Sequence, residues 1–218
     1  MKNYSLPTRN QCFDIIKKYH VPPNIVKHSL ATAKLAVFLA KKLKEKNVAV
    51  DVELVERACL LHDVARICEV KESDYNNIGI TVTEQQRTAW DKLKTEYNAA
   101  GHEDTAYELL KEQYPVLALT IKKHRYVSVL DENDRPSTWE EKIVYYADKR
   151  VMHERIVPLK ERLDDAHQRN AHLRQMKGQN NINTDKVDRL IFELEQEIFT
   201  KIGLNPVEVT DESISEIQ

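Results

Sequence analysis

Apolar residues recur at intervals of three and four along most of the chain, a spacing that places them on one face of an α-helix. The alternation of apolar and polar residues that is typical of β-strands is scarce. Helix formers dominate the long stretches, and the chain contains only 4 glycines. The pattern therefore predicts an all-α fold built around one main hydrophobic core.

Breakers and capping residues divide this pattern into separate helices. Pro22 and Pro23 end a first short helix, and we expect Asn24 to cap the second. Residues 69–100 form a polar insertion in which residues 78–82 are expected to be extended. The other expected helices cover residues 25–46, a segment that begins near residue 51, and residues 83–97, 103–113, 115–126, 138–155 and 184–202.

The C-terminal part of the chain differs from the rest in its charge. Residues 157–175 are densely charged and run into GQNNINTD, which is typical of a linker or a helix break. Gly203 and Pro206 follow the last long helix and mark its end, and the acidic tail beyond them is expected to be loose. We predict a domain over residues 1–156 and a charged helical C-terminal extension over residues 157–218.

Composition narrows the class of protein. The chain has 218 residues and a formal net charge of −2, so it lacks the broad basic surface that binds long nucleic acids. It contains no run of 18 uncharged apolar residues and no N-terminal signal-peptide pattern. Cys12, Cys59 and Cys68 have no metal-binding spacing. We expect a cytoplasmic protein with reduced thiols and with neither a membrane nor a long nucleic acid as partner.

Histidine and aspartate side chains interrupt the apolar faces of several expected helices. The run ACLLHDVARI, residues 58–67, places two polar groups side by side where unpaired groups are costly. A lone inward histidine is more often a hydrogen-bonded core residue than a ligand, but one shared metal centre would satisfy the whole set. The candidate ligands are His28, His62, Asp63, His102, His124 and Asp148.

Four imidazoles and two carboxylates form a donor set that suits divalent ions of the first transition row. Iron or manganese fits best, and cobalt, nickel or zinc also fits, whereas magnesium and calcium prefer oxygen ligands. One tetrahedral ion cannot use so many ligands. We therefore expect two ions that share a bridging carboxylate.

The order H…HD…H…H…D resembles the HD-domain metal-dependent phosphohydrolases, and in particular their dinuclear subgroup. The segment EKIVYYADKRV, residues 141–151, is also similar to the last motif of small bacterial and archaeal HD hydrolases, including the symmetrical diadenosine tetraphosphate hydrolases. The resemblance implies a helical bundle with the metal site in its core. It also implies hydrolysis of a small phosphorylated substrate, such as a nucleotide or dinucleotide, by a hydroxide that bridges the ions.

The resemblance also implies a division of the ligands. His28, His62, Asp63 and Asp148 would hold one ion, and Asp63 would bridge to a second ion held by His102 and His124. His62 and Asp63 would act in catalysis together with Arg66, which we expect one turn beyond His62 on the same helix. The candidates for substrate binding are Arg66, Lys123, Arg125 and Lys149, although a solvated helix face explains Lys123 and Lys149 equally well.

Other interpretations stay open at this level. A di-iron oxygenase or a regulatory metal-binding module could carry the same ligands, and a homodimer is compatible with the sequence. Tyr75, Trp90 and Tyr97 could stack on a nucleobase, but aromatic residues in an insertion more often anchor it to the core. His153, which follows Asp148 by five residues, is expected to be structural.

Overall fold

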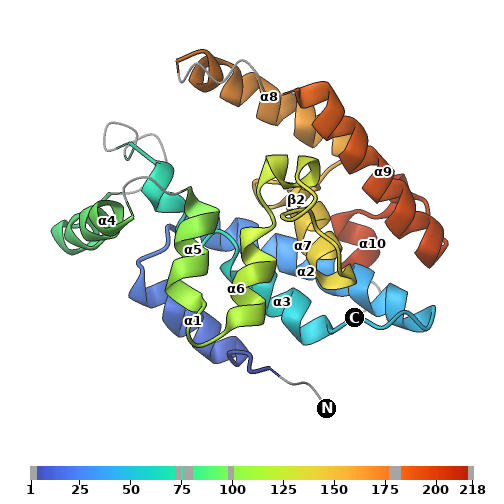
Figure 1. The fold of residues 1–218 in the computed structure, drawn as a ribbon, viewed down its shortest axis with the longest axis horizontal. Coiled ribbons are helices and arrows are strands. Elements are labelled where there is room, and N and C mark those ends of the chain that lie inside the picture. Colours follow the sequence, from blue (N-terminus) through green and yellow to red (C-terminus); the bar gives the residue numbers. More distant parts are fainter. Residues whose placement is uncertain (1–3, 72–74, 76–80, 98–100, 177–182, 216–218) are drawn as a thin grey trace.

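The structure is a computed structural model and describes residues 4–71, 75, 81–97, 101–176 and 183–215. Its described part is helical apart from one small hairpin, which confirms the predicted all-α fold (Figure 1). Helix α4 lies at one end of the molecule, and α8 and α9 pass along the other side. None of the described helices combines the length and the apolar character that crossing a bilayer requires.

Helices and strands are labelled in their order along the chain. The α-helices are α1 (Arg9–Lys18), α2 (Pro23–Glu45), α3 (Val52–Leu61), α4 (Glu84–Glu96), α5 (His102–Leu110), α6 (Pro115–Lys122), α7 (Trp139–Asp148), α8 (Leu159–Met176), α9 (Thr184–Ile202) and α10 (Asp211–Ser215). Short 3-10 helices are η1 (Arg66–Glu69), η3 (Tyr126–Leu130) and η4 (Pro206–Glu208). The hairpin pairs β1 (Val151–Met152) with β2 (Arg155–Ile156) in antiparallel fashion.

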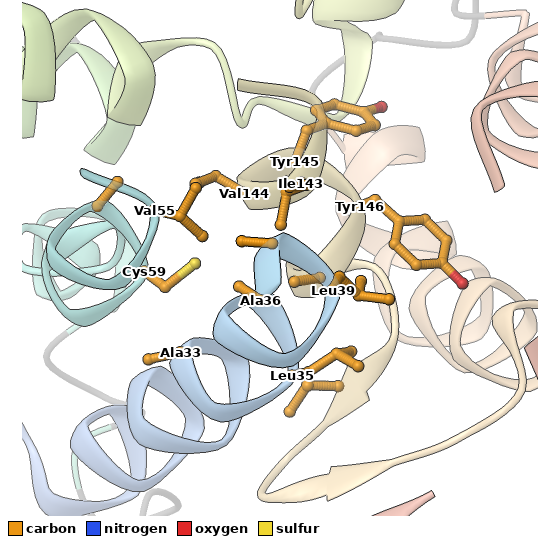
Figure 2. Packing of buried hydrophobic residues seen from close by; sticks show 14 of the residues in the cluster. Ala33, Leu35, Ala36, Leu39, Val55, Cys59, Ile143, Val144, Tyr145 and Tyr146 are labelled. Carbon is orange, nitrogen blue, oxygen red and sulfur yellow. The ribbon is translucent and has the colours of Figure 1, made fainter. Parts of the chain in front are cut away.

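Helices α2, α3 and α7 form the centre of the core. Helices α2 and α3 contribute buried apolar residues to it, and the C-terminal half of α7, residues 143–148, is buried on all sides. Figure 2 shows side chains of the three helices meeting. The apolar stripe of α9 joins the same core, with Val187, Ile191 and Ile198 fully buried. The residues that meet in Figure 2 include Ala36 and Leu39 of α2, Val55 and Cys59 of α3, and Ile143 and Val144 of α7.

One buried cation connects α7 to the C-terminal part of the chain. The side chain of Arg150 is 2% exposed, and its Nη1 lies 3.4 Å from Glu195 Oε2 on α9. A buried guanidinium is tolerated only when its donors are satisfied. Those donors are taken up by Tyr146 Oη and by the main-chain carbonyl groups of Val157, Pro206 and Val209.

The insertion between α3 and α5 is attached through a small apolar cluster of its own. Trp90 of α4 is fully buried with Tyr75, Leu93 and Ile67. Its Nε1–H also donates to the carbonyl group of Tyr19 over 3.3 Å. These contacts confirm that Trp90 and Tyr75 anchor the insertion.

Several predicted boundaries were wrong. Helix α2 begins at Pro23 rather than after an Asn24 cap, because proline at the first helical position has its φ already set. The helix expected over residues 138–155 ends at Asp148 and gives way to the hairpin. The helix expected over residues 115–126 ends at Lys122.

Other boundaries agree, and some lie outside the described residues. Thr83 caps α4 through a capping box, as the helix expected over residues 83–97 requires. The tail is not loose over its described length, because α10 forms and buries Ile214. Most of the extended piece expected at 78–82 and of the linker GQNNINTD lies outside the described residues.

Candidate metal centre

The His62-Asp63 doublet lies where α3 ends. The helix starts at Val52, and the side chain of its N-cap, Asp51, accepts hydrogen bonds from the main-chain N–H groups of Glu53 and Leu54. His62 is the C-cap, and its Nδ1–H donates to the carbonyl group of Cys59 over 2.7 Å. Asp63 follows in the turn. The helix end therefore directs His62 Nε2 and the Asp63 carboxylate away from the helix axis.

A first cluster forms around this helix end. His28 of α2 and Asp148, the last residue of α7, approach each other to 3.0 Å between Nε2 and Oδ1. His62 Nε2 lies 3.6 Å from Asp148 Oδ1 and 3.6 Å from Asp63 Oδ2. Possible ligand atoms of His28, His62 and Asp63 all lie within 4.8 Å of one another. The cluster thus offers imidazole nitrogens and carboxylate oxygens around one small space.

A second cluster forms on the other side of Asp63. His102 is the first residue of α5, and its Nε2 lies 3.1 Å from Asp63 Oδ1. His124 lies just beyond α6, with Nε2 at 3.9 Å from the same oxygen. The two Nε2 atoms are 3.3 Å apart. Asp63 therefore presents Oδ2 to the first cluster and Oδ1 to the second.

One buried nitrogen atom, Nε2 of His62, indicates whether this arrangement fits a metal ion. Its Nε2 is buried and has no hydrogen-bond partner among the described residues. Buried polar atoms without a partner are rare, since each costs free energy. A divalent ion bound by Nε2 would satisfy the atom, and neutral imidazoles with carboxylates are suitable ligands. The two clusters therefore fit divalent metal binding.

Main-chain carbonyl groups orient three of the four imidazoles. His62 and His124 donate from Nδ1 to residues three positions earlier, Cys59 and Ile121. His28 Nδ1–H donates to the carbonyl group of His153 over 3.0 Å. With Nδ1 protonated, each ring keeps Nε2 free to bind a metal ion. His153 has φ of 58° in the hairpin turn, and this main-chain role was missed because no side-chain pattern encodes it.

Two carboxylates surround the fourth imidazole, that of His102. Its Nδ1 lies 3.1 Å from Glu69 Oε1 and 3.3 Å from Glu103 Oε2. Gly101, the N-cap of α5, leaves room for both, since a Cβ there would lie 2.8 Å from Glu103 Oε2 and 3.5 Å from Glu69 Oε1. A carboxylate bound to Nδ1 fixes the ring and makes Nε2 a better ligand. Neither glutamate was among the predicted site residues.

The central carboxyl groups are ionised despite their burial. Burial opposes ionisation of Asp63, yet the adjacent His62 helps to hold the pKa of Asp63 well below its usual range. Burial likewise opposes ionisation of Asp148, and the Lys149 ammonium group with the nearby imidazoles lowers its pKa strongly. Both groups are therefore available as anionic ligands.

His102 responds to the same charges in the opposite sense. Burial and the Arg66 guanidinium disfavour a second proton on the ring, but Asp63 and Glu69 raise the pKa of His102 to about 9. The proton supplies positive charge between carboxylates. A divalent cation supplies such charge when it binds and displaces the proton.

A pocket of about 520 Å³ opens over both clusters. Five of the six predicted ligands line it, and His62 lies behind them with its side chain 1% exposed. Cavities of this size bind small molecules. Helix α8 forms part of the opposite wall, with Arg162 and Arg169 among the lining residues. These two arginines were not predicted, because only the tertiary packing of α8 brings them to the site.

The predicted phosphate-binding cations differ in their positions. Arg66 and Lys149 line the pocket, and Lys149 Nζ donates to Asp148 Oδ2 over 2.6 Å. Lys123 instead forms a buried ion pair with Glu141 at 3.0 Å. Arg125 pairs with Asp104. Neither Lys123 nor Arg125 is among the residues that line the pocket, so we do not propose either as a substrate ligand.

Arg66 reaches the pocket by a different route from the one predicted. Helix α3 ends at Leu61, so Arg66 is not one helical turn beyond His62 on the same helix. It begins η1, which follows a turn over residues 62–65. Its Nη1 lies 3.2 Å from Glu69 Oε2 and 3.1 Å from His102 Nδ1. Arg66 therefore stands beside the second cluster.

Two relatives are similar to the chain over more than half of its length. A tRNA (cytidine(56)-2'-O)-methyltransferase of Picrophilus torridus is 27% identical over 167 residues, which are 77% of this chain and 43% of that protein. An uncharacterized protein of Methanocaldococcus jannaschii is 28% identical over 128 residues, 59% of this chain and 66% of that protein. The chain thus spans less than two thirds of either relative. No solved structure matches significantly.

The match to a family model covers the elements that carry the ligands. It extends over residues 25–152, from the start of α2 to the hairpin, and the family is described as the HD domain. His28, the His62-Asp63 doublet, His102, His124 and Asp148 all fall inside it. The boundary predicted at residue 156 stays a prediction. The helical fold, the clustered ligands and this match together place the chain in the HD domain family, a superfamily of metal-dependent phosphohydrolases.

Proposed function

We propose that the protein is a metal-dependent phosphohydrolase that hydrolyses a small, nucleotide-like phosphate ester. The observation that carries this proposal is the position of Asp63, whose two oxygens face separate ligand clusters below one open pocket. His28, His62, Asp63 and Asp148 would hold the first ion, and Asp63, His102 and His124 the second. Iron or manganese suits these ligands best.

The bound ions would lower the pKa of water and stabilise the negative charge that develops on the phosphoryl group. The chain's own residues position the reactants. In hydrolysis, a water oxygen forms a bond to phosphorus, the ester P–O bond breaks, and the leaving oxygen takes up a proton. Arg66 lines the pocket beside the second cluster, where its planar guanidinium could bind two phosphate oxygens.

The test combines metal analysis with phosphate release. Purified protein should contain about two transition-metal ions per chain and should release phosphate from at least one member of a panel of nucleotides, dinucleotides and phosphate monoesters. Reactions run in air and without oxygen separate hydrolysis from an oxygenase. Products that form only in air, without phosphate release, would overturn the proposal.

Replacing His124 with alanine should separate the two ions. Of the two Asp63 oxygens, His124 Nε2 approaches Oδ1, which faces the second cluster. His124 is not one of the proposed ligands of the first cluster, so that cluster keeps its ligands. Metal content should fall from about two ions to about one, and kcat should fall by on the order of 100-fold or more. His167→Ala is the matched control, because His167 pairs with Asp188 and is neither a proposed ligand nor among the residues that line the pocket. Unchanged turnover in His124→Ala would contradict a role for the second ion.

Replacing Glu69 with glutamine should weaken binding of the second ion, although Glu69 is not one of the proposed metal ligands. The neutral amide keeps the size of the side chain but removes the negative charge beside His102 Nδ1. Affinity for the second ion should fall about 10–100-fold, while the first ion stays bound. Metal titration followed by calorimetry measures both. Glu108→Gln is the control on α5, where Glu108 pairs with Lys111. An equal loss at both sites would contradict the assignment.

Methyl transfer is not carried over from the Picrophilus torridus relative. The matched residues make up 43% of that protein, so the named activity belongs to a chain of which less than half is shared. The proposal therefore rests on the HD domain match and on the geometry around Asp63.

A further inference from the structure

Helix α8 presents one face to the pocket. Arg162, Leu163, Ala166 and Arg169 line it, and their spacing of one, three and three residues places them on one side of the helix. The helix begins at Leu159, beyond the residues 25–152 that match the family. This wall is therefore an addition to the part of the chain that carries the proposed ligands.

The two walls of the pocket differ in charge. On the side of the clusters, carboxylates stand beside the cations: Lys149 pairs with Asp148, and Arg66 lies 3.2 Å from Glu69. The described lining residues of α8 include two arginines and no acidic residue. One carboxylate outside the lining, that of Asp165, lies 3.9 Å from Arg162 Nη1 and 2.6 Å from Arg169 Nη2, so two cations share one anion on this wall. Two divalent ions at the clusters would make the whole pocket strongly positive. A ligand with a single phosphate at the clusters would leave the remaining positive charge of the α8 wall without an anion.

Both arginines of α8 are held in place and keep donors for a ligand. Arg162 Nε–H donates to the carbonyl group of Val151 over 2.8 Å, and the side chain is 16% exposed. Arg169 donates from Nε and Nη2 to Asp165 Oδ2, over 2.9 and 2.6 Å. A guanidinium has five N–H donors, so these bonds leave others available to an anion.

We propose that Arg162 and Arg169 form a second anion subsite, and that the substrate is an organic molecule with at least two phosphate groups. One phosphate would lie at the ligand clusters and the other at α8. Leu163 and Ala166 separate the two arginines and offer an apolar surface to the group that joins the phosphates. This inference rests on the proposed function, since the first phosphate occupies the proposed reaction site.

The test compares ligands that carry one and two anionic groups and that cannot be hydrolysed. Methylphosphonate, methylene bisphosphonate and propylene bisphosphonate are titrated into manganese-loaded protein, and metal content is measured before and after. The two bisphosphonates distinguish adjacent phosphates from separated ones. Arg169→Gln should weaken binding of at least one bisphosphonate about tenfold, and that of methylphosphonate less than twofold.

Lys160→Gln provides the matched control. Lys160 is on α8 and pairs with Asp164 four residues later, but it does not line this pocket. The variant loses the same net charge and should bind all three ligands like the wild type. Equal effects of Lys160→Gln and Arg169→Gln, or no effect of Arg169→Gln on either bisphosphonate, would overturn the subsite.

Turnover of p-nitrophenyl phosphate keeps the two proposals apart. If wild-type protein releases phosphate neither from p-nitrophenyl phosphate nor from the panel of nucleotides, dinucleotides and phosphate monoesters, but Arg169→Gln selectively weakens bisphosphonate binding, the proposed hydrolysis fails and the subsite stands. If phosphate is released and the variants bind alike, the subsite fails and the hydrolase stands.

Discussion

Replacing Asp63 with alanine is expected to remove metal from both clusters at once. Its Oδ2 faces His62 and its Oδ1 faces His102, so one truncation takes a ligand from each ion. Metal content should fall from about two ions per chain to near zero. Phosphate release should fall by far more than the roughly 10–100-fold that follows the loss of an outer partner of a metal ligand. Elemental analysis and steady-state turnover measure the two effects.

Asp104→Ala is the matched control for this experiment. Asp104 is on α5 and pairs with Arg125, and it does not line the pocket. This variant should keep its metal and its turnover, and circular dichroism should show helical content like that of the wild type for both proteins. If Asp63→Ala kept two ions per chain, Asp63 would not be a shared ligand.

Replacing Arg150 with methionine is expected to lower the free energy of unfolding by about 3–5 kcal/mol. The substitution keeps much of the volume but leaves Glu195 without its cation in a buried position, and three carbonyl groups lose a donor. Urea denaturation measures the loss from a shifted midpoint at an unchanged m-value. At denaturant concentrations where the Arg150→Met variant is folded, it should still bind metal, because Arg150 does not line the pocket.

A second substitution shows whether the buried pair causes this loss. Glu195→Gln in the Arg150→Met background removes the unpaired charge and should restore part of the stability, which gives a coupling free energy from the double-mutant cycle. Arg155→Met is the exposed control in the hairpin and should change stability by less than about 0.5 kcal/mol. A loss below about 1 kcal/mol in Arg150→Met would contradict a structural role for this cation.

The helices with strong local signals were the ones that sequence could predict. Helix α4 begins after Thr83 with a capping box, and α9 ends at Gly203, which has φ of 73°. Both signals act within a few residues and need no tertiary contact. The end of α6 at Lys122 carries no such signal, because neither glycine nor proline follows it before His124. Its end depends on packing.

The candidate ligands were predictable because each stood on an apolar face. A buried imidazole or carboxylate needs a partner, and six such groups on five separate segments indicate one shared centre. The residues around the ligands were less predictable. The carbonyl group that orients His28 belongs to His153, in a hairpin turn where a helix was expected. Every residue type has a main-chain carbonyl group, so the identity of a residue does not indicate which carbonyl group will orient a ligand.

Which cationic side chains line the pocket could be determined only from the fold. Lys123 and Arg125 flank His124 in sequence, yet Lys123 pairs with Glu141, Arg125 pairs with Asp104 and Glu103, and neither cation lines the pocket. Arg162 and Arg169 are far from every ligand in sequence, yet both line it. Sequence adjacency does not determine the direction of a side chain once the helix has ended, and the positions of charged side chains are therefore set by tertiary contacts.

The 3-10 helix η1 contacts both the pocket and the apolar cluster that attaches α4. Arg66 and Glu69 stand beside His102 at the pocket, while Ile67 between them packs in the cluster that holds Trp90 and α4. A brief local unfolding of α4 would remove the apolar support of this turn. Amide protons of η1 would then exchange with solvent at the rate at which the insertion opens. The stability of one wall of the pocket would thus depend on a helix whose residues are not among those that line it.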